Sequence, residues 1–390
     1  MRSAGHQIRV TVQLVATEDC GVRWSGRYER ELSDVFAVQD DICRSIATAL
    51  ELQLATPAGV PRTRPEPRAH IEYLKGRHFW NRRTANSLAQ SLEHYRRAID
   101  LDPHYAPAHC GIADTLVVQA LNEQVSASDA LAQARAHSEE ALRLAPDFAE
   151  ALVSAAAVAS VLEWDWMKGD ALFRRAVDIN PRHSLAHYLR AILNLAPRAC
   201  WEPALIAMDH AIELDPVSPV LQRDLGIVHY LRGEFREAEE ALQAASTLDT
   251  AFRGSLFWLG RALAEQGRYD DALRMFQARL AEPGANTRVL ASVVHTLGLM
   301  GRQAEALEQF ERLQREAASG QVPALNLAIA YLGLGQRDEA LAEIERACAS
   351  HAVPLYQLGV DPIFRPVRDT RRFQAILREM KLDTAATACT

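Results

Sequence analysis

Four glycines in the second half of the chain recur at one fixed interval, and this interval constrains the fold more than any other feature of the sequence. The interval is 34 residues, and it separates Gly233, Gly267, Gly301 and Gly335. Four alanines keep the same interval, at Ala238, Ala272, Ala306 and Ala340. A period of this length indicates stacked repeats, because a unit of this size cannot bury its apolar residues alone.

Each repeated unit has the pattern of two short helices joined by a turn. The segments LGIVHYLRGEFREAEEAL at 225–242 and LGRALAEQGRYDDALRMF at 259–276 both begin with Leu-Gly and share a later glycine, an alanine and a bulky residue. The later glycine favours the turn because glycine adopts positive φ without strain. Small residues such as Gly226 and Ala238 let the two helices approach closely, and a large residue such as Leu242 fills the space between them.

Four looser units precede the four regular ones. Each ends in a motif that closes with proline, namely LDP at 101–103, LAP at 144–146, INP at 179–181 and LDP at 214–216. Proline ends the second helix of the unit, because it has no backbone N–H to donate and its ring clashes with the preceding turn. The sequence therefore predicts about eight helix pairs over residues 69–350.

This pattern resembles the tetratricopeptide repeat family, in which Leu-Gly, Tyr, Ala, Phe or Tyr, Ala and Pro recur over one unit. The resemblance implies a mainly α fold, a right-handed superhelix of helix pairs known as an α-solenoid. Beyond the repeats, residues 351–390 contain Phe373, Ile376, Leu377 and Met380 at helical spacing. We expect them to form a C-terminal capping helix that covers the last repeat.

The N-terminal segment has a different pattern. Residues from Ile8 to Ala16 and from Val22 to Glu29 alternate apolar and polar side chains across a polar turn, which predicts a β-hairpin. Apolar residues at helical spacing then predict one helix from Asp34 to Leu54. We expect this helix to shield one face of the hairpin and one strand edge to stay unpaired.

Four prolines in residues 55–68 forbid a continuous helix there and indicate a linker. The predicted domains are therefore the hairpin and helix at 1–54, the linker at 55–68, the repeats at 69–350 and the capping helix with its tail at 351–390.

The N-terminal segment also resembles the end of the TolB-amino-terminal-like domain. The matching residues are Gln13-Leu14, Trp24-Ser25, Arg27-Tyr28, Asp34-Val35-Phe36 and Gln39-Asp40. In bacterial signalling proteins this domain often precedes tetratricopeptide repeats, beside nucleotide cyclases, kinases or winged-helix regulators. The resemblance implies an alternative function, in which the chain is the regulatory or sensor part of a signalling enzyme or transcriptional regulator whose output domain is missing from it.

Motifs of catalysis are lacking in the sequence. It contains neither GxxxxGK[ST] nor GxSxG, and Asp338 stands where a third glycine would follow Gly333 and Gly335. His183 and His187 are four residues apart, but no glutamate stands between them as a general base. We therefore expect a protein that is not an enzyme and that needs no cofactor or metal ion.

Composition bounds the partners and the compartment. A net charge of −7 gives no general attraction for nucleic acid or for anionic membranes. The chain begins without an apolar leader and has no stretch of about 20 apolar residues. Its six cysteines are scattered without a CxxC pair, which predicts reduced thiols. We expect a cytoplasmic protein that binds neither nucleic acid nor membrane.

The family resemblance implies a concave groove lined by the first helix of each unit. Its positions fall on Arg223, Ile227, Tyr230, Phe257, Arg261, Arg288, His295, Leu325 and Ile329. This mixture of apolar residues, arginines and a histidine suits a protein or peptide partner with apolar anchors and an acidic group. Alternatively, several of these residues pack between neighbouring first helices. Neither an asparagine ladder nor a lysine-based carboxylate clamp is indicated, because the relevant positions hold Asp224, Trp258, Ser292 and Asn326.

Overall fold

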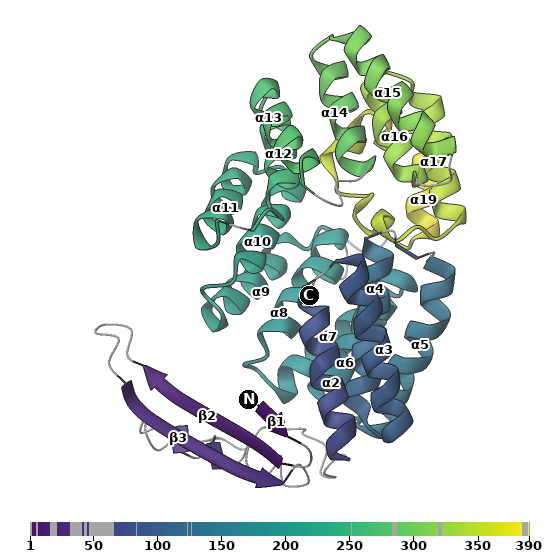
Figure 1. Ribbon diagram of the computed structural model, residues 1–390. Helices are drawn as coiled ribbons and strands as arrows, with labels where there is room; N and C mark the ends of the chain where they lie inside the picture. The colour runs from purple at the N-terminus through teal and green to yellow at the C-terminus, as the bar shows by residue number, and fades with distance from the viewer. Residues whose placement is uncertain are drawn as a thin grey trace. The chain divides into compact units, whose positions relative to one another are not determined.

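The computed structural model describes residues 2–4, 7–15, 22–31, 41–42, 45–46, 66–82, 84–122, 124–125, 127–250, 252–282, 287–318, 322–383 and 389. Most of these residues are helical (Figure 1). The chain divides into two compact units, which are described separately. The first comprises residues 1–112 and 140–148, and the second comprises residues 113–139 and 149–390. The predicted mainly α fold is confirmed.

Eight helix pairs occupy the described part of the predicted repeat region. The four looser pairs are α2 (Pro67–Trp80) with α3 (Ala85–Leu101), α4 (Ala106–Leu121) with α5 (Ala127–Leu144), α6 (Ala149–Ala157) with α7 (Trp166–Ile179), and α8 (Ser184–Arg190) with α9 (Trp201–Leu214). The regular pairs are α10 (Pro219–Arg232) with α11 (Phe235–Leu248), α12 (Leu256–Glu265) with α13 (Tyr269–Leu280), α14 (Thr287–Leu299) with α15 (Gln303–Ala318), and α16 (Ala324–Gly333) with α17 (Arg337–Ala349).

The glycine period is explained by the turns of the regular pairs. All four periodic glycines have positive φ, between 72° and 94°, and each follows the first helix of its pair. The predicted close helix approach is also present within the pairs. A side chain at Gly226 would press on Leu242, and one at Gly260 would press on Phe276. The sequence therefore predicts the turns of the four regular pairs and the close packing within two of them.

The first helices of two looser pairs widen into π-helical turns. Helix α6 continues as η2 (Val158–Leu162), and α8 continues as η3 (Ala191–Leu195) and the short 3₁₀ helix η4 (Ala196–Arg198). Both segments are buried. The repeat pattern gives no sign of this widening.

The N-terminal residues form a three-stranded antiparallel sheet in the order β1-β2-β3. The predicted hairpin is present as β2 (Gln7–Val15) and β3 (Val22–Glu31), with Val10 opposite Tyr28. The additional strand β1 (Arg2–Ala4) was not expected, and it pairs with residues 7–9 of β2. Strand β1 covers this part of β2, but among the described strands β3 pairs with β2 alone, so the expected unpaired edge is present on β3.

The predicted helix after the hairpin lies mostly outside the described residues. Residues 41–42 and 45–46 are helical. The hydroxyl of Tyr28 donates a hydrogen bond of 3.0 Å to the hydroxyl of Ser45, which joins β3 to this helix. Residues 34–40, which carry part of the TolB-like resemblance, and most of the predicted linker are also outside the described residues.

The predicted capping helix is confirmed as α19 (Arg371–Glu379), which packs against α17. Phe373, Ile376, Leu377 and Met380 are all buried. Between α17 and α19 the chain forms η5 (Val353–Gln357), η6 (Pro362–Phe364) and the short helix α18 (Arg365–Arg368). We call residues 351–368 the return segment, because η5 contacts η2 and η4 of the third and fourth pairs while η6 contacts α16.

Two tryptophans that precede or begin α7 of the third pair contact the C-terminal region. The ring of Trp164 stacks on His351 with 4.2 Å between the ring centres. The indole N–H of Trp166 donates a hydrogen bond of 2.7 Å to the carbonyl oxygen of Met380. Both tryptophans are buried, as core residues should be, and their partners are almost 200 residues or more away in sequence.

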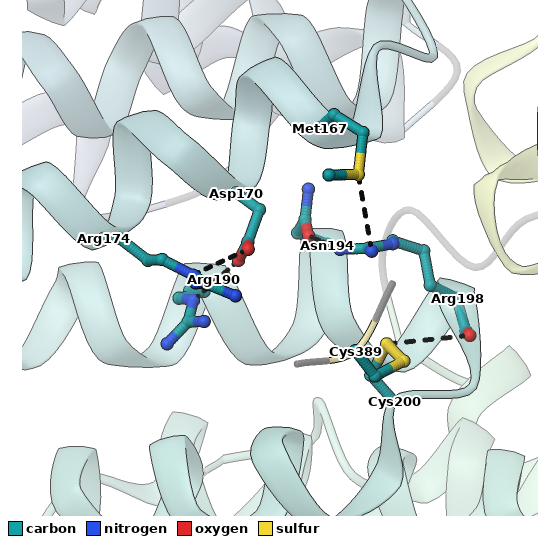
Figure 2. Close-up of a disulfide and its surroundings, with 8 residues drawn as sticks. All are labelled: Met167, Asp170, Arg174, Arg190, Asn194, Arg198, Cys200 and Cys389. Carbon is teal, nitrogen blue, oxygen red and sulfur yellow. Dashed lines mark hydrogen bonds and ion pairs between the residues drawn. A yellow bond between two sulfur atoms is a disulfide. The ribbon is translucent and has the colours of Figure 1, made fainter. Parts of the chain in front are cut away.

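A disulfide joins Cys200 to Cys389, with 5.5 Å between the two Cα atoms (Figure 2). The expectation that these thiols are reduced is therefore wrong for this pair. Scattered cysteines gave no motif, because the two partners are 189 residues apart and only the folded chain brings them together. Cys110 and Cys348 are buried and do not take part in a disulfide.

Beside the disulfide lies a buried polar network (Figure 2). The side-chain amide of Asn194 donates to the Ser160 hydroxyl at 2.9 Å and to the carbonyl oxygen of Trp166 at 2.8 Å. Arg198 donates to the amide oxygen of Asn194 at 3.0 Å. This network connects η3 and η4 to the third pair, so its role is to satisfy polar groups where the helices widen.

Candidate binding groove

In the second unit, the return segment lies against first helices of the pairs. Arg261 of α12 is 3% exposed, and it meets Asp361 at the start of η6, which is 5% exposed. The guanidinium donates from Nη1 to Oδ2 at 2.9 Å and from Nη2 to Oδ1 at 2.7 Å. Burial disfavours the charged guanidinium, but the carboxylate of Asp361 raises the pKa of Arg261 above its ordinary value. The guanidinium of Arg261 therefore stays charged.

Tyr230 of α10 completes this contact. Its hydroxyl donates a hydrogen bond of 3.3 Å to Asp361, and its ring lies 4.9 Å from the guanidinium carbon of Arg261. Burial raises the pKa of Tyr230 well above the ordinary value, so the phenol is neutral and available as a donor. Asp361 also accepts the backbone N–H of Ile363, which caps η6. One carboxylate thus holds the return segment to two first helices.

A second ion pair joins the return segment to α12. Arg365 of α18 donates to Glu265 at 2.8 Å, and its guanidinium carbon lies 5.4 Å from the ring centre of Phe235. Burial raises the pKa of Glu265 despite the opposing charges of Arg365 and Arg261. This contact is more exposed than the Asp361 contact and therefore contributes less.

His295 of α14 lies in the same region and lines a cavity of about 10 Å³ with Tyr230, Arg261 and Ile363. This volume is about that of one water molecule's probe sphere. Burial, together with the smaller effect of the charge of Arg261, lowers the pKa of His295 to about 4. His295 is therefore neutral near pH 7.

A larger cavity of about 210 Å³ lies beside this contact. Three predicted groove residues line it, namely Arg223, Ile227 and Arg288. Trp258 from α12 and Tyr356 and Gln357 from η5 also line it. The return segment therefore forms one wall of a chamber whose other walls are first helices.

The charges of this chamber are fixed by close contacts. Arg223 binds the 1% exposed carboxylate of Asp224 through Nε at 2.6 Å and through Nη2 at 2.9 Å. Arg288 lies over two rings, with its guanidinium carbon 4.7 Å from the centre of Phe257 and 5.0 Å from that of Trp258. A guanidinium held over two aromatic rings is attracted to both of them, which restricts its position.

The remaining predicted groove residues lie outside both cavities. Phe257 packs against Trp258 and Phe276, and it is 7% exposed. Leu325 and Ile329 are buried in α16, which packs against α14. These three side chains fit the alternative of packing between helices. Use of any of the nine residues by a partner stays a prediction.

Sequence reasoning missed Asp361, Tyr356 and Gln357. These residues belong to the segment in which three prolines interrupt the repeat pattern, so no unit position was assigned to them. The Asp361-Pro362 pair is the one local signal, because aspartate before proline favours a turn or a helix start. The partners of Asp361, however, are 100 and 131 residues away.

The two histidines at helical spacing have structural contacts. His183 caps α8 by accepting the backbone N–H of Ala186 at 3.2 Å. The Nε2 atom of His187 lies 2.9 Å from the carbonyl oxygen of Pro181. In the part of the chain that the structure describes, no group of three His, Cys, Asp or Glu side chains is placed to hold a metal ion. No helix among the same residues is long and apolar enough to cross a membrane.

Comparisons with known proteins identify the repeats. The tetratricopeptide repeat family matches residues 223–286 and, through a second profile of the same description, residues 321–346. Among curated proteins, "Putative adenylate cyclase 3" of Rhizobium meliloti (strain 1021) is 30% identical over 148 residues. The match covers 36% of this chain, which spans only 25% of the length of that relative.

Human IFIT1 shares the fold of this chain. Human IFIT1, solved as a dimer with m7Gppp-AAAA, has a TM-score of 0.56 and 15% identity, with 79% of this chain and 76% of that chain covered. A tetratricopeptide repeat protein from Parabacteroides merdae ATCC 43184 has a TM-score of 0.41 and 12% identity, with 81% and 100% covered. The two profile matches show that the chain contains tetratricopeptide repeats at residues 223–286 and 321–346, as the resemblance of the sequence pattern implied.

Proposed function

We propose that this protein is a non-catalytic scaffold whose first helices bind a protein segment with an acidic residue next to apolar ones. The observation that carries the proposal is the contact of Asp361 with Arg261 and Tyr230. Here the groove binds such a segment from its own chain, since Asp361 is followed by the buried residues Ile363 and Phe364.

A partner with the same chemistry competes with the return segment for this site. The competition is intramolecular, so the return segment has the advantage of a high effective concentration. A partner therefore succeeds when it makes additional contacts along the repeats or when the return segment is weakened. We therefore propose that the groove has a closed state, with the return segment bound, and an open state, with the return segment displaced.

A labelled peptide that copies residues 355–368 tests the proposal. We expect it to bind the full chain weakly by fluorescence anisotropy and to bind the Asp361→Asn variant several-fold more tightly, because the variant loosens the resident segment. Asp369→Asn is the matched control, since Asp369 is exposed. Equal affinity of the peptide for wild type and for Asp361→Asn would overturn the proposal.

The lack of catalysis is part of the same proposal. It is supported by the absence of nucleotide-binding and nucleophile motifs from the sequence. The name of the Rhizobium relative defines the sharpest test, which is incubation of the purified chain with ATP and Mg²⁺. Formation of cyclic AMP by the chain alone would contradict this part of the proposal.

The second candidate function is a regulatory part of a signalling protein. It is favoured by the relative named as an adenylate cyclase and by the TolB-like resemblance of residues 8–42. Sequencing of the DNA directly 5′ of Met1 tests one form of it. An in-frame continuation encoding an α/β portion would support this candidate, and an in-frame stop codon beside a ribosome-binding site would count against it.

The class of partner and the cellular compartment of this protein are also proposals. We propose protein partners rather than nucleic acid, on the net charge of −7, and a titration with capped oligoadenylate at low salt tests this. We also propose a cytoplasmic location, against which the disulfide of Cys200 stands as a counter-argument, because disulfides are rare in reducing compartments. Alkylation of thiols in intact cells, followed by peptide mapping, tests the location. Alkylated Cys200 would support a reducing compartment such as the cytoplasm, and unmodified Cys200 linked to Cys389 would support an oxidising one.

A further inference from the structure

The disulfide of Cys200 and Cys389 joins the end of the chain to a part of the fourth pair that lies next to the return segment. Only Ala199 separates Cys200 from η4, and η4 contacts η5 of the return segment. Cys389 packs against the buried apolar core of the fourth pair. A change at this bond therefore acts close to where the return segment is seated.

The buried polar network beside the disulfide connects it to a second anchor of the C-terminal region (Figure 2). Arg198 of η4 donates to Asn194, and Asn194 donates to the carbonyl oxygen of Trp166. The indole of Trp166 in turn donates to the carbonyl oxygen of Met380, which follows α19. All four residues are buried, so a shift of η4 is transmitted to the place where Met380 is held.

The turn that carries Cys200 has a backbone conformation that residues with a side chain rarely adopt. Ala199 has a φ of 59°, in the left-handed region, which is unfavourable for alanine. The N–H of Ala199 donates to Ala196 at 2.9 Å, and the N–H of Cys200 donates to Leu195 at 3.0 Å. The disulfide is a further constraint on this turn, and its loss leaves the turn and η4 less firmly held.

Contacts on both sides of the return segment keep it in place. His351, at its start, stacks on Trp164, and beyond its end the chain is held by the Met380 contact and by the disulfide. The disulfide is the one covalent constraint among these contacts. A cross-link between residues 189 positions apart restricts the conformations of every state in which the segment has left the first helices.

The bond can be attacked from one side. Cys200 is 2% exposed, whereas Cys389 is partly exposed. A thiolate of a dithiol reductant attacks Sγ of Cys389, and the electron pair of the broken bond leaves on Sγ of Cys200, which takes up a proton. The second thiol of the reductant then displaces Cys389 in the same way. The protein gains two thiols, and the dithiol is oxidised to a cyclic disulfide.

We propose that the disulfide of Cys200 and Cys389 is a redox switch of the groove. The oxidised bond holds the return segment on the first helices, and its reduction favours the open state, in which a protein partner reaches Arg261. The switch rests on the proposed function of the groove. It also fits the proposed cytoplasmic location, because disulfides in reducing compartments are mostly transient, catalytic or redox-sensing.

Hydrogen exchange of the full chain with and without dithiothreitol tests the switch in the absence of any partner. The N–H groups of Asp361 and Phe364 are hydrogen-bonded within the return segment, so they report its opening. We expect them to exchange several-fold faster in the reduced protein, while the amides of α13 keep their rates. Unchanged exchange in the return segment, or equal acceleration in α13, would overturn the proposal.

Cys389→Ser should copy the reduced state without reductant, and dithiothreitol should not change its exchange any further. Cys110→Ala is the matched control, because Cys110 is also buried but takes no part in a disulfide. This control should respond to dithiothreitol as wild type does. A response of Cys389→Ser to dithiothreitol as large as that of wild type would also overturn the proposal, and reduced wild type supplies the comparison if the variant does not fold.

The labelled peptide of residues 355–368 separates this proposal from the proposed function. We expect it to bind reduced wild type several-fold more tightly than oxidised wild type. Equal affinity for these two forms, together with tighter binding to Asp361→Asn, would overturn the switch and support the groove. Faster exchange of the return segment on reduction, without peptide binding to any form, would support redox release of the segment and overturn the groove as a binding site.

Discussion

The two guanidinium nitrogens of Arg261 hold the two carboxylate oxygens of Asp361 across 100 residues of sequence. The pair is almost completely buried, and the Tyr230 hydroxyl is a third donor to the same carboxylate. A buried pair of this kind adds little net stability over an apolar pair of the same size, but the loss of one partner leaves a buried charge. Its main effect is to specify where the return segment lies.

The first prediction concerns this pair. Arg261→Met should lower the free energy of unfolding by about 3–5 kcal/mol, because Asp361 is left buried without its partner. The double variant Arg261→Met with Asp361→Leu should recover much of this loss. Urea denaturation followed by circular dichroism measures both changes.

The control for this prediction is an exposed ion pair. Arg302 and Glu305 pair at the start of α15, where both side chains are well exposed. Arg302→Met should change the free energy of unfolding far less than Arg261→Met does, because solvent screens the exposed pair. If Arg261→Met and Arg302→Met cost the same, the buried pair does not anchor the return segment.

The repeat register is the part of this fold that the sequence predicts best. A fixed interval assigns Gly267 to a turn and Arg261 to a first helix without any knowledge of three-dimensional contacts. Local chemistry decides these assignments, since glycine tolerates positive φ and apolar residues at helical spacing face a neighbour. The structure places both residues as the register predicts.

The position of the return segment and the disulfide cannot be predicted in this way, for one physical reason. Asp361 and Cys389 have no unit position, and their partners are fixed by how the chain turns back after the last repeat. The sequence predicts that Arg261 lines a groove for a partner with an acidic group. Nothing in the sequence shows that Asp361 of the same chain supplies that group. Gln357 carries no sequence signal, because the burial of its amide depends on residues that are far away in the sequence.

The second prediction concerns pH. The pKa of His295 is about 4 in the folded protein, against an ordinary value of 6.5, so the unfolded chain binds the extra proton first. The contribution of His295 is therefore complete above pH 6.5 and is lost as the pH falls from 6.5 towards 4. At pH 5 the loss should be about 2 kcal/mol.

Urea titrations at several pH values measure this slope. Glu265 acts in the opposite direction, because its pKa is raised and its protonation favours the folded state as the pH falls. His295→Gln separates the two contributions, since this variant keeps Glu265 but cannot take up the histidine proton. An equally steep loss of stability in His295→Gln would show that another group is responsible.

The third prediction concerns the disulfide. Cys389→Ser should lower the free energy of unfolding by about 2–4 kcal/mol under oxidising conditions, because the bond closes a long loop in the unfolded chain. Dithiothreitol should destabilise wild type and leave Cys389→Ser unchanged. Burial raises the pKa of the Cys348 thiol to about 12, so this free cysteine should not exchange with the disulfide.

Peptide mapping without reductant checks the pairing directly. The fragment that contains Cys200 should be recovered linked to the C-terminal fragment. Recovery of both as free thiols from protein purified without reductant would contradict the disulfide.

The fourth prediction compares two glycines with different roles. At Gly267, which has a φ of 76°, a side chain would meet no atom within 4 Å, so only the backbone conformation opposes alanine. At Gly298 a side chain would overlap the carbonyl oxygen of Gly333, where α14 and α16 approach each other. Gly267→Ala should therefore cost about 1–2 kcal/mol, the strain of left-handed backbone, with little change in structure.

Gly298→Ala should cost clearly more, because the two helices have to separate and the contacts of α16 with α14 and η6 are disturbed together. Parallel melting curves of the two variants measure the difference. Hydrogen exchange adds a spatial readout, since only Gly298→Ala should deprotect amides in α16. Equal destabilisation by the two variants would mean that backbone conformation, rather than the close approach of α14 and α16, is what requires glycine in this array.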